Sequence, residues 1–445
     1  MHPLARLALP AIAMLLLAGC AQPMRRSAEA APQPTDCPAA VAPIAKCLSG
    51  QDSAGAWYVI AIPNAWNGDL VLHAHGGPTL GVPNPKRTFE DLQRWAIVPR
   101  AGYAWAGTTF RHGGVAVLDA AGDVERLRRI FVEHVAVPKR TVLHGQSWGA
   151  SVAARAAETD PLGPDGRRRY DAVLLTSGVL GGGTRSYDFR LDLRVVYQYL
   201  CANHPRPVEA QYPLWAGLLP ASTLTPAELA RRADECLGAR TPAAQRTPAQ
   251  QARMKTLVDV IRIPERSVVG HLNWATWHFQ DIVQNRTGGR NPFGNDGVRY
   301  AGSTDDAALN AGVLRYRADP QALVALGADT DPTGRIPVPV LTVHAVGDPT
   351  AFVELESAFR ATMERAGTAD HLVQAFTAHT EHSYLADPVY PAALEALLEW
   401  VERGLKPTPE QLAARCALLE ARYGPGCRFL PAYRSASLDT RVAPR

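Results

Sequence analysis

The 445-residue sequence predicts an α/β protein with a doubly wound, mostly parallel sheet and an inserted helical cap domain. Apolar, strand-like runs alternate with amphipathic helical stretches, as they do when helices cover both faces of a parallel sheet. Residues with catalytic chemistry follow directly after several of these runs. A long stretch of chain separates two of them, Ser147 and Asp348, which leaves room for a second domain.

The strands and helices of the core are predicted from hydrophobic periodicity. The helix expected over 123–134 has Val124, Leu127, Ile130 and Phe131 on one face. A second helix is expected over 388–404. The predicted strands cover 70–74, 103–110, 140–144, 172–177, 338–345 and 372–377.

The candidate nucleophile is Ser147, within Gly145-Gln146-Ser147-Trp148-Gly149. This Gly-x-Ser-x-Gly pentapeptide follows a strand and precedes an Ala-rich helix, the context of a nucleophile elbow. A residue at such a strained turn needs small neighbours, and the two glycines meet that need. A chance occurrence is the alternative, but further motifs accompany this one.

An oxyanion-binding loop is predicted at His75-Gly76-Gly77-Pro78, directly after the strand 70–74. Acyl transfer needs N–H donors aimed at the developing oxyanion, and glycines let the backbone come close to the substrate. Pro78 has no N–H. We therefore expect the donors to be the N–H groups of Gly77 and Trp148.

The candidate acid is Asp348, which follows the strand 338–345 within a Gly-Asp-Pro turn. A carboxylate at the carboxyl end of a strand can orient the catalytic histidine. An ordinary turn residue is the alternative interpretation. Asp331 is a weaker candidate because it precedes the strand.

The candidate base must follow the acid in the chain, and two histidines lie after the last predicted strand. His382 is assigned as the base because it sits farther along the loop that leads into the last core helix. His379 remains the alternative. The histidine that is not the base would be a loop residue.

These motifs resemble those of an α/β-hydrolase-fold serine hydrolase of the secreted bacterial kind. His75 to Pro78 and Ser147-Trp148-Gly149 are similar to the proline iminopeptidase branch, although Thr79 and Gln146 stand where that branch has glycines. Pro63 to Leu70, with Trp-Asn-Gly before the strand, resembles tannase-like esterases. His382-Ser383-Tyr384 looks like their His-Cys-x-Phe ending, with Ser in place of Cys.

The resemblance implies a core over 36–182 and 336–405 and a helical cap or lid over 183–335. In the cap, helices are expected over 191–200, 226–237, 248–263 and 274–283. The aromatic run 271–279 is interpreted as cap core in preference to substrate contact. The segment 287–293 is expected to be a loop. A C-terminal extension over 406–445 is expected to contain a helix at 409–423.

The amino terminus predicts export and lipid anchoring. Residues 1–19 have the pattern of a lipoprotein signal peptide, with an apolar stretch too short to span a membrane. It ends in Leu17-Ala18-Gly19-Cys20, a lipobox, so Cys20 is the expected lipidation site. A plain signal peptide is the alternative. Residues 20–35 are expected to be a flexible tether. The expected location is the bacterial cell envelope, facing the periplasm or on the outer membrane.

Six further cysteines support export, because disulfides persist in an oxidising compartment. Six cysteines allow 15 pairings. Proximity in sequence favours Cys37–Cys47, Cys201–Cys236 and Cys416–Cys427.

Other function classes find little support. Net charge is only +4 and the basic residues are dispersed, so nucleic acid is not an expected partner. His73, His75 and His144 lack the further ligands that zinc needs, and no dinucleotide fingerprint is present, so we expect no metal and no cofactor. The expected function is a serine carboxylesterase acting on a small-molecule ester. The alternatives are an exported aminopeptidase of the proline iminopeptidase type and a non-catalytic binding lipoprotein.

Overall fold

The computed structural model describes residues 29–159, 161–163 and 166–445. The expected signal peptide, Cys20 and the first residues of the expected tether lie outside this described part. Within it, every helix is too short or too polar to cross a bilayer.

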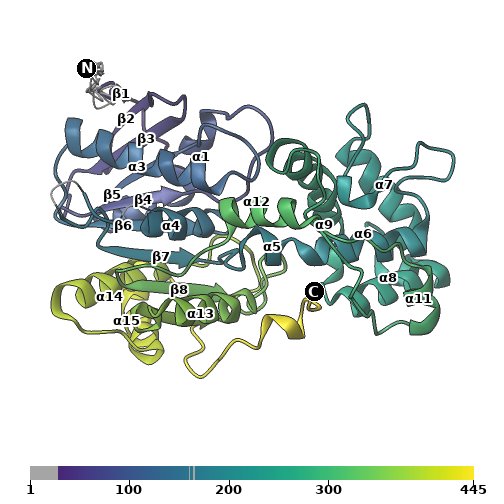
Figure 1. The fold of residues 1–445 in the computed structure, drawn as a ribbon. Helices are drawn as coiled ribbons and strands as arrows, with labels where there is room; N and C mark the ends of the chain where they lie inside the picture. The colour runs from purple at the N-terminus through teal and green to yellow at the C-terminus, as the bar shows by residue number, and fades with distance from the viewer. Residues whose placement is uncertain (1–28, 160, 164–165) are drawn as a thin grey trace, which may run out of the picture.

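A nine-stranded sheet forms the centre of the described chain, with the strand order β1-β2-β3-β5-β4-β6-β7-β8-β9 (Figure 1). Strands β1, β2, β3 and β5 pair antiparallel, and β5, β4, β6, β7, β8 and β9 pair parallel. This architecture confirms the predicted α/β-hydrolase fold class. The strands are β1 (Gln33–Thr35), β2 (Ala45–Gln51), β3 (Trp57–Pro63), β4 (Leu70–Ala74), β5 (Ala104–Thr108), β6 (Thr141–Gln146), β7 (Ala172–Thr176), β8 (Val340–Ala345) and β9 (Leu372–Thr377).

The parallel strands are buried on both faces, which explains their continuous apolar sequences. One face packs Trp95, Tyr390 and Leu412 into a first hydrophobic core. The other face packs Phe131 and Phe359 into a second. The helices are α1 (Lys86–Arg94), α2 (Ile97–Arg100), α14 (Val389–Arg403) and α15 (Pro409–Tyr423) at the first core, and α3 (Val117–His134), α4 (Trp148–Thr159) and α13 (Leu355–Ala366) at the second.

The N-terminal segment differs from expectation. Residues 33–35, expected to belong to a flexible tether, form β1 and pair with Cys47 to Ser49 of β2. Glu29 is also buried, and its carboxylate accepts hydrogen bonds from the backbone and hydroxyl of Ser53. The tether expected over 20–35 is therefore wrong for residues 29–35.

Helical structure fills the chain between β7 and β8 and forms a third hydrophobic core beside the sheet (Figure 1). We call this part the cap. Its helices are α5 (Gly182–Ser186), α6 (Asp188–Cys201), η1 (Leu214–Ala216), α7 (Pro226–Leu237), η2 (Ala243–Gln245), α8 (Pro248–Ile261), η3 (Glu265–Ser267), α9 (Val268–Asn273), η4 (Trp274–His278), α10 (Phe279–Asp281), η5 (Ile282–Arg286), α11 (Asp306–Gly312) and α12 (Pro320–Thr330). Two short turns, η6 (Ala369–His371) and η7 (Leu438–Thr440), lie outside the cap.

Three disulfides join neighbouring segments of the chain. They are Cys37–Cys47, Cys201–Cys236 and Cys416–Cys427, the pairs favoured by proximity in sequence. The first joins the segment before β2 to β2, the second lies in the cap, and the third fixes the chain that follows α15.

The C-terminal tail runs from the sheet to the cap. Leu430 donates its backbone N–H to Phe376 O of β9 at 2.8 Å. Farther along, Arg441 forms an ion pair with Glu354 at 3.0 Å. Arg445 then reaches Asp192 of α6 at 2.9 Å. The tail therefore contacts both parts of the molecule.

Candidate active site

Ser147 lies at the turn between β6 and α4 with a φ of 57°, the left-handed region that a residue with a side chain rarely adopts. Backbone hydrogen bonds hold the turn: Ser147 N donates to Thr176 O at 2.9 Å, and Val179 N donates to Ser147 O at 3.0 Å. A Cβ at Gly145 would lie 2.3 Å from the carbonyl oxygen of Gly149, and one at Gly149 only 2.0 Å from that of Ala74. The two glycines are therefore required by close backbone approach.

The three candidate catalytic side chains form one chain of hydrogen bonds. His382 Nε2 lies 2.7 Å from Ser147 Oγ, and His382 Nδ1 lies 2.7 Å from Asp348 Oδ2. Asp348 Oδ1 accepts backbone N–H bonds from Thr350 at 2.8 Å and Ala351 at 3.0 Å. The Asp348 side chain is fully buried, whereas 18% of the His382 side chain is exposed. The array is accessible from the histidine side.

The two alternative residues lie elsewhere. His379 is buried, and its Nδ1 lies 2.9 Å from Thr377 Oγ1. Burial lowers the pKa of His379. Asp331 accepts hydrogen bonds from the backbone and hydroxyl of Thr184, where the chain enters the cap. The structure brings His382 and Asp348 together with Ser147 and does not bring these two residues there.

The oxyanion loop lies against the elbow. A Cβ at Gly76 would meet Gln146 Oε1 at 2.1 Å, so the loop touches the residue that precedes Ser147. Gly77 has a φ of 71°, and nothing lies within 4 Å of where its Cβ would be. Trp148 is the first residue of α4, where a backbone N–H has no acceptor within the helix. The N–H groups of Gly77 and Trp148 accordingly make no hydrogen bond to the described residues.

A second buried array stands behind Asp348, and sequence reasoning missed it. His344 Nδ1 donates to Glu356 Oε1 at 3.0 Å, and its Nε2 donates to Ala351 O at 2.9 Å. Burial opposes the charged imidazole, but the hydrogen bond and charge of Glu356, with the charge of Asp348, raise the pKa of His344. His344 Nε2 lies 3.7 Å from Asp348 Oδ2.

The cap touches both loops of the candidate site through two histidines. His271 Nε2 donates to the carbonyl oxygen of Pro349, next to Asp348, at 2.9 Å. His278 Nε2 donates to the carbonyl oxygen of Pro78, next to Gly77, at 3.0 Å. Burial lowers the pKa of His271 to about 3 and that of His278 to about 4, so both imidazoles are neutral. We call the segment 271–278, which spans the two loops, the roof.

The roof contains the π-helical segment η4 of Trp274 to His278. Such wide turns occur often at functional sites. Within the aromatic run, Phe279 is fully buried and stacks on Phe293 at 4.0 Å, as expected for cap core. Trp274 and Trp277 are partly exposed, and Trp274 stacks on His278 at 4.0 Å. The run therefore divides between cap core and the surface of the roof.

The histidines near the start of the sheet form a core contact. His73 Nδ1 lies 3.0 Å from His144 Nδ1, and the His73 ring packs on Trp95 and Trp105. Burial lowers the pKa of both imidazoles, that of His144 to about 3. Among the described residues, no group of three or more potential ligand side chains is arranged to hold a metal ion.

No known family model and no functionally curated protein matches this chain. The chain is similar to solved structures with low identity. An esterase from Aspergillus oryzae has 13% identity and a TM-score of 0.45, over 82% of this chain and 81% of that one. Candida antarctica lipase A has 10% identity and a TM-score of 0.45, over 93% and 88%. The rice cell wall degrading esterase LipA from Xanthomonas oryzae has 12% identity and a TM-score of 0.38, over 85% and 90%.

Proposed function

We propose that this protein is a serine hydrolase that cleaves carboxylic esters through an acyl-enzyme intermediate. The observation that carries the proposal is the continuous hydrogen-bonded chain from Ser147 through His382 to Asp348. Ser147 lies at a strained elbow, beside two backbone N–H groups that have no acceptor among the described residues. A binding module has no need of this combination.

In the proposed mechanism, Ser147 Oγ attacks the acyl carbon while His382 Nε2 takes the hydroxyl proton. Asp348 holds the imidazole tautomer and stabilises the imidazolium that forms. The N–H groups of Gly77 and Trp148 bind the tetrahedral oxyanion. His382 then returns the proton to the leaving alcohol. Water, activated by the same histidine, releases the acid.

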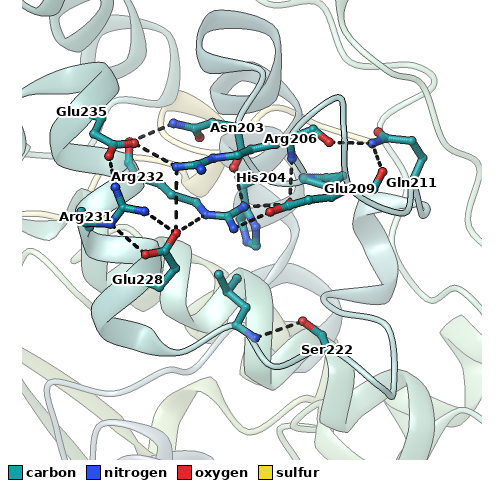
Figure 2. A network of polar contacts seen from close by, with 12 residues as sticks. Asn203, His204, Arg206, Glu209, Gln211, Ser222, Glu228, Arg231, Arg232 and Glu235 are labelled. Carbon is teal, nitrogen blue, oxygen red and sulfur yellow. Dashed lines mark hydrogen bonds and ion pairs between the residues drawn. The ribbon is translucent and has the colours of Figure 1, made fainter.

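The alternative, an aminopeptidase, needs a free carboxylate in the cap to bind the substrate's α-ammonium. The acids of the cap have other partners. Figure 2 shows Glu209, Glu228 and Glu235 bound to arginines of one cap network. Four further acids of the cap also have partners: Asp259 has Lys255, Glu265 has Arg246, Asp234 has the backbone of Arg240, and Asp281 has Val115 N and Asn285. This favours the ester over the peptide as substrate.

We further propose that the protein is exported and anchored to the cell envelope by lipid at Cys20. Three disulfides support an oxidising compartment. Metabolic labelling with an alkyne fatty acid tests the anchor. Label should enter the wild type and be absent from Cys20→Ser, and equal labelling of both would refute lipidation at this residue.

A fluorophosphonate probe and a substrate panel test the hydrolase. The probe should label the wild type and not Ser147→Ala, and this variant should lose about three orders of magnitude or more of ester turnover with little change in melting temperature. Nitrophenyl esters should be cleaved with a higher kcat/KM than aminoacyl nitroanilides. The opposite order would favour the aminopeptidase. Absence of both labelling and turnover would favour the binding lipoprotein.

A further inference from the structure

Arg190 of α6 is a buried cation without a carboxylate partner. It is 4% exposed, and its guanidinium carbon lies 4.9 Å from the ring centre of Tyr187, 4.6 Å from that of Phe189 and 5.1 Å from that of Trp274. Nη1 donates to Ser186 O at 2.7 Å, whereas the buried Nε has no acceptor. In the described ranges no acid forms an ion pair with it. An unpaired buried charge is costly, so this one calls for an explanation.

The Arg190 guanidinium lies at the roof of the candidate active site. It stands over Trp274, which stacks on His278, and His278 binds the carbonyl next to the oxyanion loop. Burial, and to a smaller extent the charge of Arg190, lowers the pKa of both roof histidines. The roof histidines thus connect this cation with the catalytic loops on both sides.

Other polar atoms of the roof are also buried without a partner. They are the acceptors His271 Nδ1, Asn273 Oδ1 and His278 Nδ1. The Nε2 atom of each histidine donates its proton to a carbonyl, so the neutral ring offers only a lone pair at Nδ1. Buried polar groups are normally satisfied. Among these atoms only the Nε–H of Arg190 can bind an anion, whereas the three lone pairs can only accept from a donor such as a hydroxyl or water.

We propose that Arg190 binds a carboxylate of the substrate, so that the preferred substrates are esters bearing a second, ionised carboxyl group. A guanidinium binds a carboxylate through two parallel hydrogen bonds, and the surrounding rings exclude water and strengthen them. The partly exposed faces of Trp274 and Trp277 accommodate the apolar part of such a molecule. This inference rests on the proposed esterase function and names its substrate class.

A second buried arginine on the same helix provides a matched control. Arg194 lies one turn after Arg190 and is fully buried. Its guanidinium donates to Thr276 Oγ1 at 2.7 Å and to the backbone oxygen of His204 at 3.3 Å, and it also contacts the His204 ring. These partners belong to the cap interior. Replacing Arg194 also removes a buried guanidinium from α6, and in the roof it removes only the hydrogen bond to the fully buried Thr276 hydroxyl.

The test compares acid and ester forms of two substrates. One pair is the mono-4-nitrophenyl ester of adipic acid and its methyl ester, with the carboxylate on the acyl side. The other is 4-acetoxybenzoate and its methyl ester, with the carboxylate on the alcohol side. At least one free acid should have a kcat/KM about 10- to 100-fold above that of its methyl ester, the value of a hydrogen-bonded charge pair. The pair in which kcat/KM differs between acid and methyl ester identifies whether Arg190 binds a carboxylate on the acyl side or on the alcohol side.

Arg190→Met should lower this acid-to-ester ratio by the same factor, whereas Arg194→Met should keep it. Arg190→Lys, which retains the charge, should restore part of it. A wild-type ratio near one in both pairs, or an equal loss of the ratio in both methionine variants, would overturn the proposal.

A binding measurement separates this inference from the proposed function. Calorimetry with adipate and with 4-hydroxybenzoate uses Ser147→Ala, which has no turnover. Binding of either anion that is lost in Ser147→Ala/Arg190→Met and kept in Ser147→Ala/Arg194→Met supports the anion site even if no ester is cleaved. Cleavage of neutral esters with no anion binding would refute the site and leave the esterase intact.

Discussion

Acid should weaken the contact between cap and core, and His278 is where this is most directly measured. The imidazole is mostly buried and neutral, with a pKa lowered to about 4, while in the unfolded chain its pKa is about 6.5. Above pH 6.5 neither state binds the proton, so stability does not depend on this group. Below pH 6.5 the unfolded state binds a proton that the folded state refuses, and stability falls.

The magnitude follows from the two pKa values. One group contributes about 1.4 kcal/mol per pH unit between them, or about 3 kcal/mol by pH 4. His144 and His271, with pKa values lowered to about 3, act in the same direction. These and the other histidines whose pKa burial lowers make the folded protein sensitive to pH values well above those at which carboxylates are protonated.

The assay is urea denaturation of wild type and His278→Gln from pH 8 to pH 4.5. Glutamine can still donate to the carbonyl of Pro78 but does not titrate. At pH 8 the two proteins differ only by the lost packing, which is the internal control. Below pH 6 the variant's curve should be flatter by about 1.4 kcal/mol per pH unit. Parallel curves over the whole range would refute the neutral, buried state of this histidine.

Three further predictions concern the site and its support. His382→Ala should abolish ester turnover, whereas His379→Ala should lose at most about tenfold, as expected of a residue outside the hydrogen-bonded chain; the reverse pattern in a nitrophenyl ester assay would contradict the assigned base. Glu356→Gln should destabilise the protein by roughly 3 kcal/mol, because it leaves a buried imidazole without its counter-charge; an unchanged midpoint in denaturant would argue against the ion pair. Mass spectrometry of non-reduced peptides should find only the three local disulfides, and a crossed bond such as Cys201 with Cys416 would refute the pairing.

The candidate site was largely predictable because its parts are short, local motifs. Each part directly follows a predicted strand: the serine of the Gly-x-Ser-x-Gly motif, the glycine pair, the acid and the histidine. The end of the strand therefore defines where each side chain lies. The helix predicted over 409–423 has these bounds in the structure. It has Pro409 in its first turn and Gly424 after its end, and both are local signals.

The features of the fold and the site that the sequence does not predict depend on contacts between distant segments of the chain. Asp188 and Asp192 lie two residues before and after Arg190, and nothing in the sequence indicates that both contact Arg445 instead. Glu356 lies in α13 and meets His344 only because β8 and the helix pack together. Strand β1 is short and contains Pro34, so it carries no hydrophobic alternation, and its pairing with β2 is a tertiary effect. The π-helical segment η4 of the roof likewise has no signal in hydrophobic periodicity.

The C-terminal tail constrains how the cap can move. A domain that is inserted through two adjacent hinge segments can rotate away from its core as a rigid body. Here the C-terminal tail is a third segment that joins the core to the cap. It is bound to β9 at Leu430 and to α6 at Arg445. An outward swing of the cap must first break the Arg445 ion pairs and extract the tail. A ligand is therefore expected to enter without a rigid-body movement of the cap, and any gating is expected to involve only side chains at the entrance.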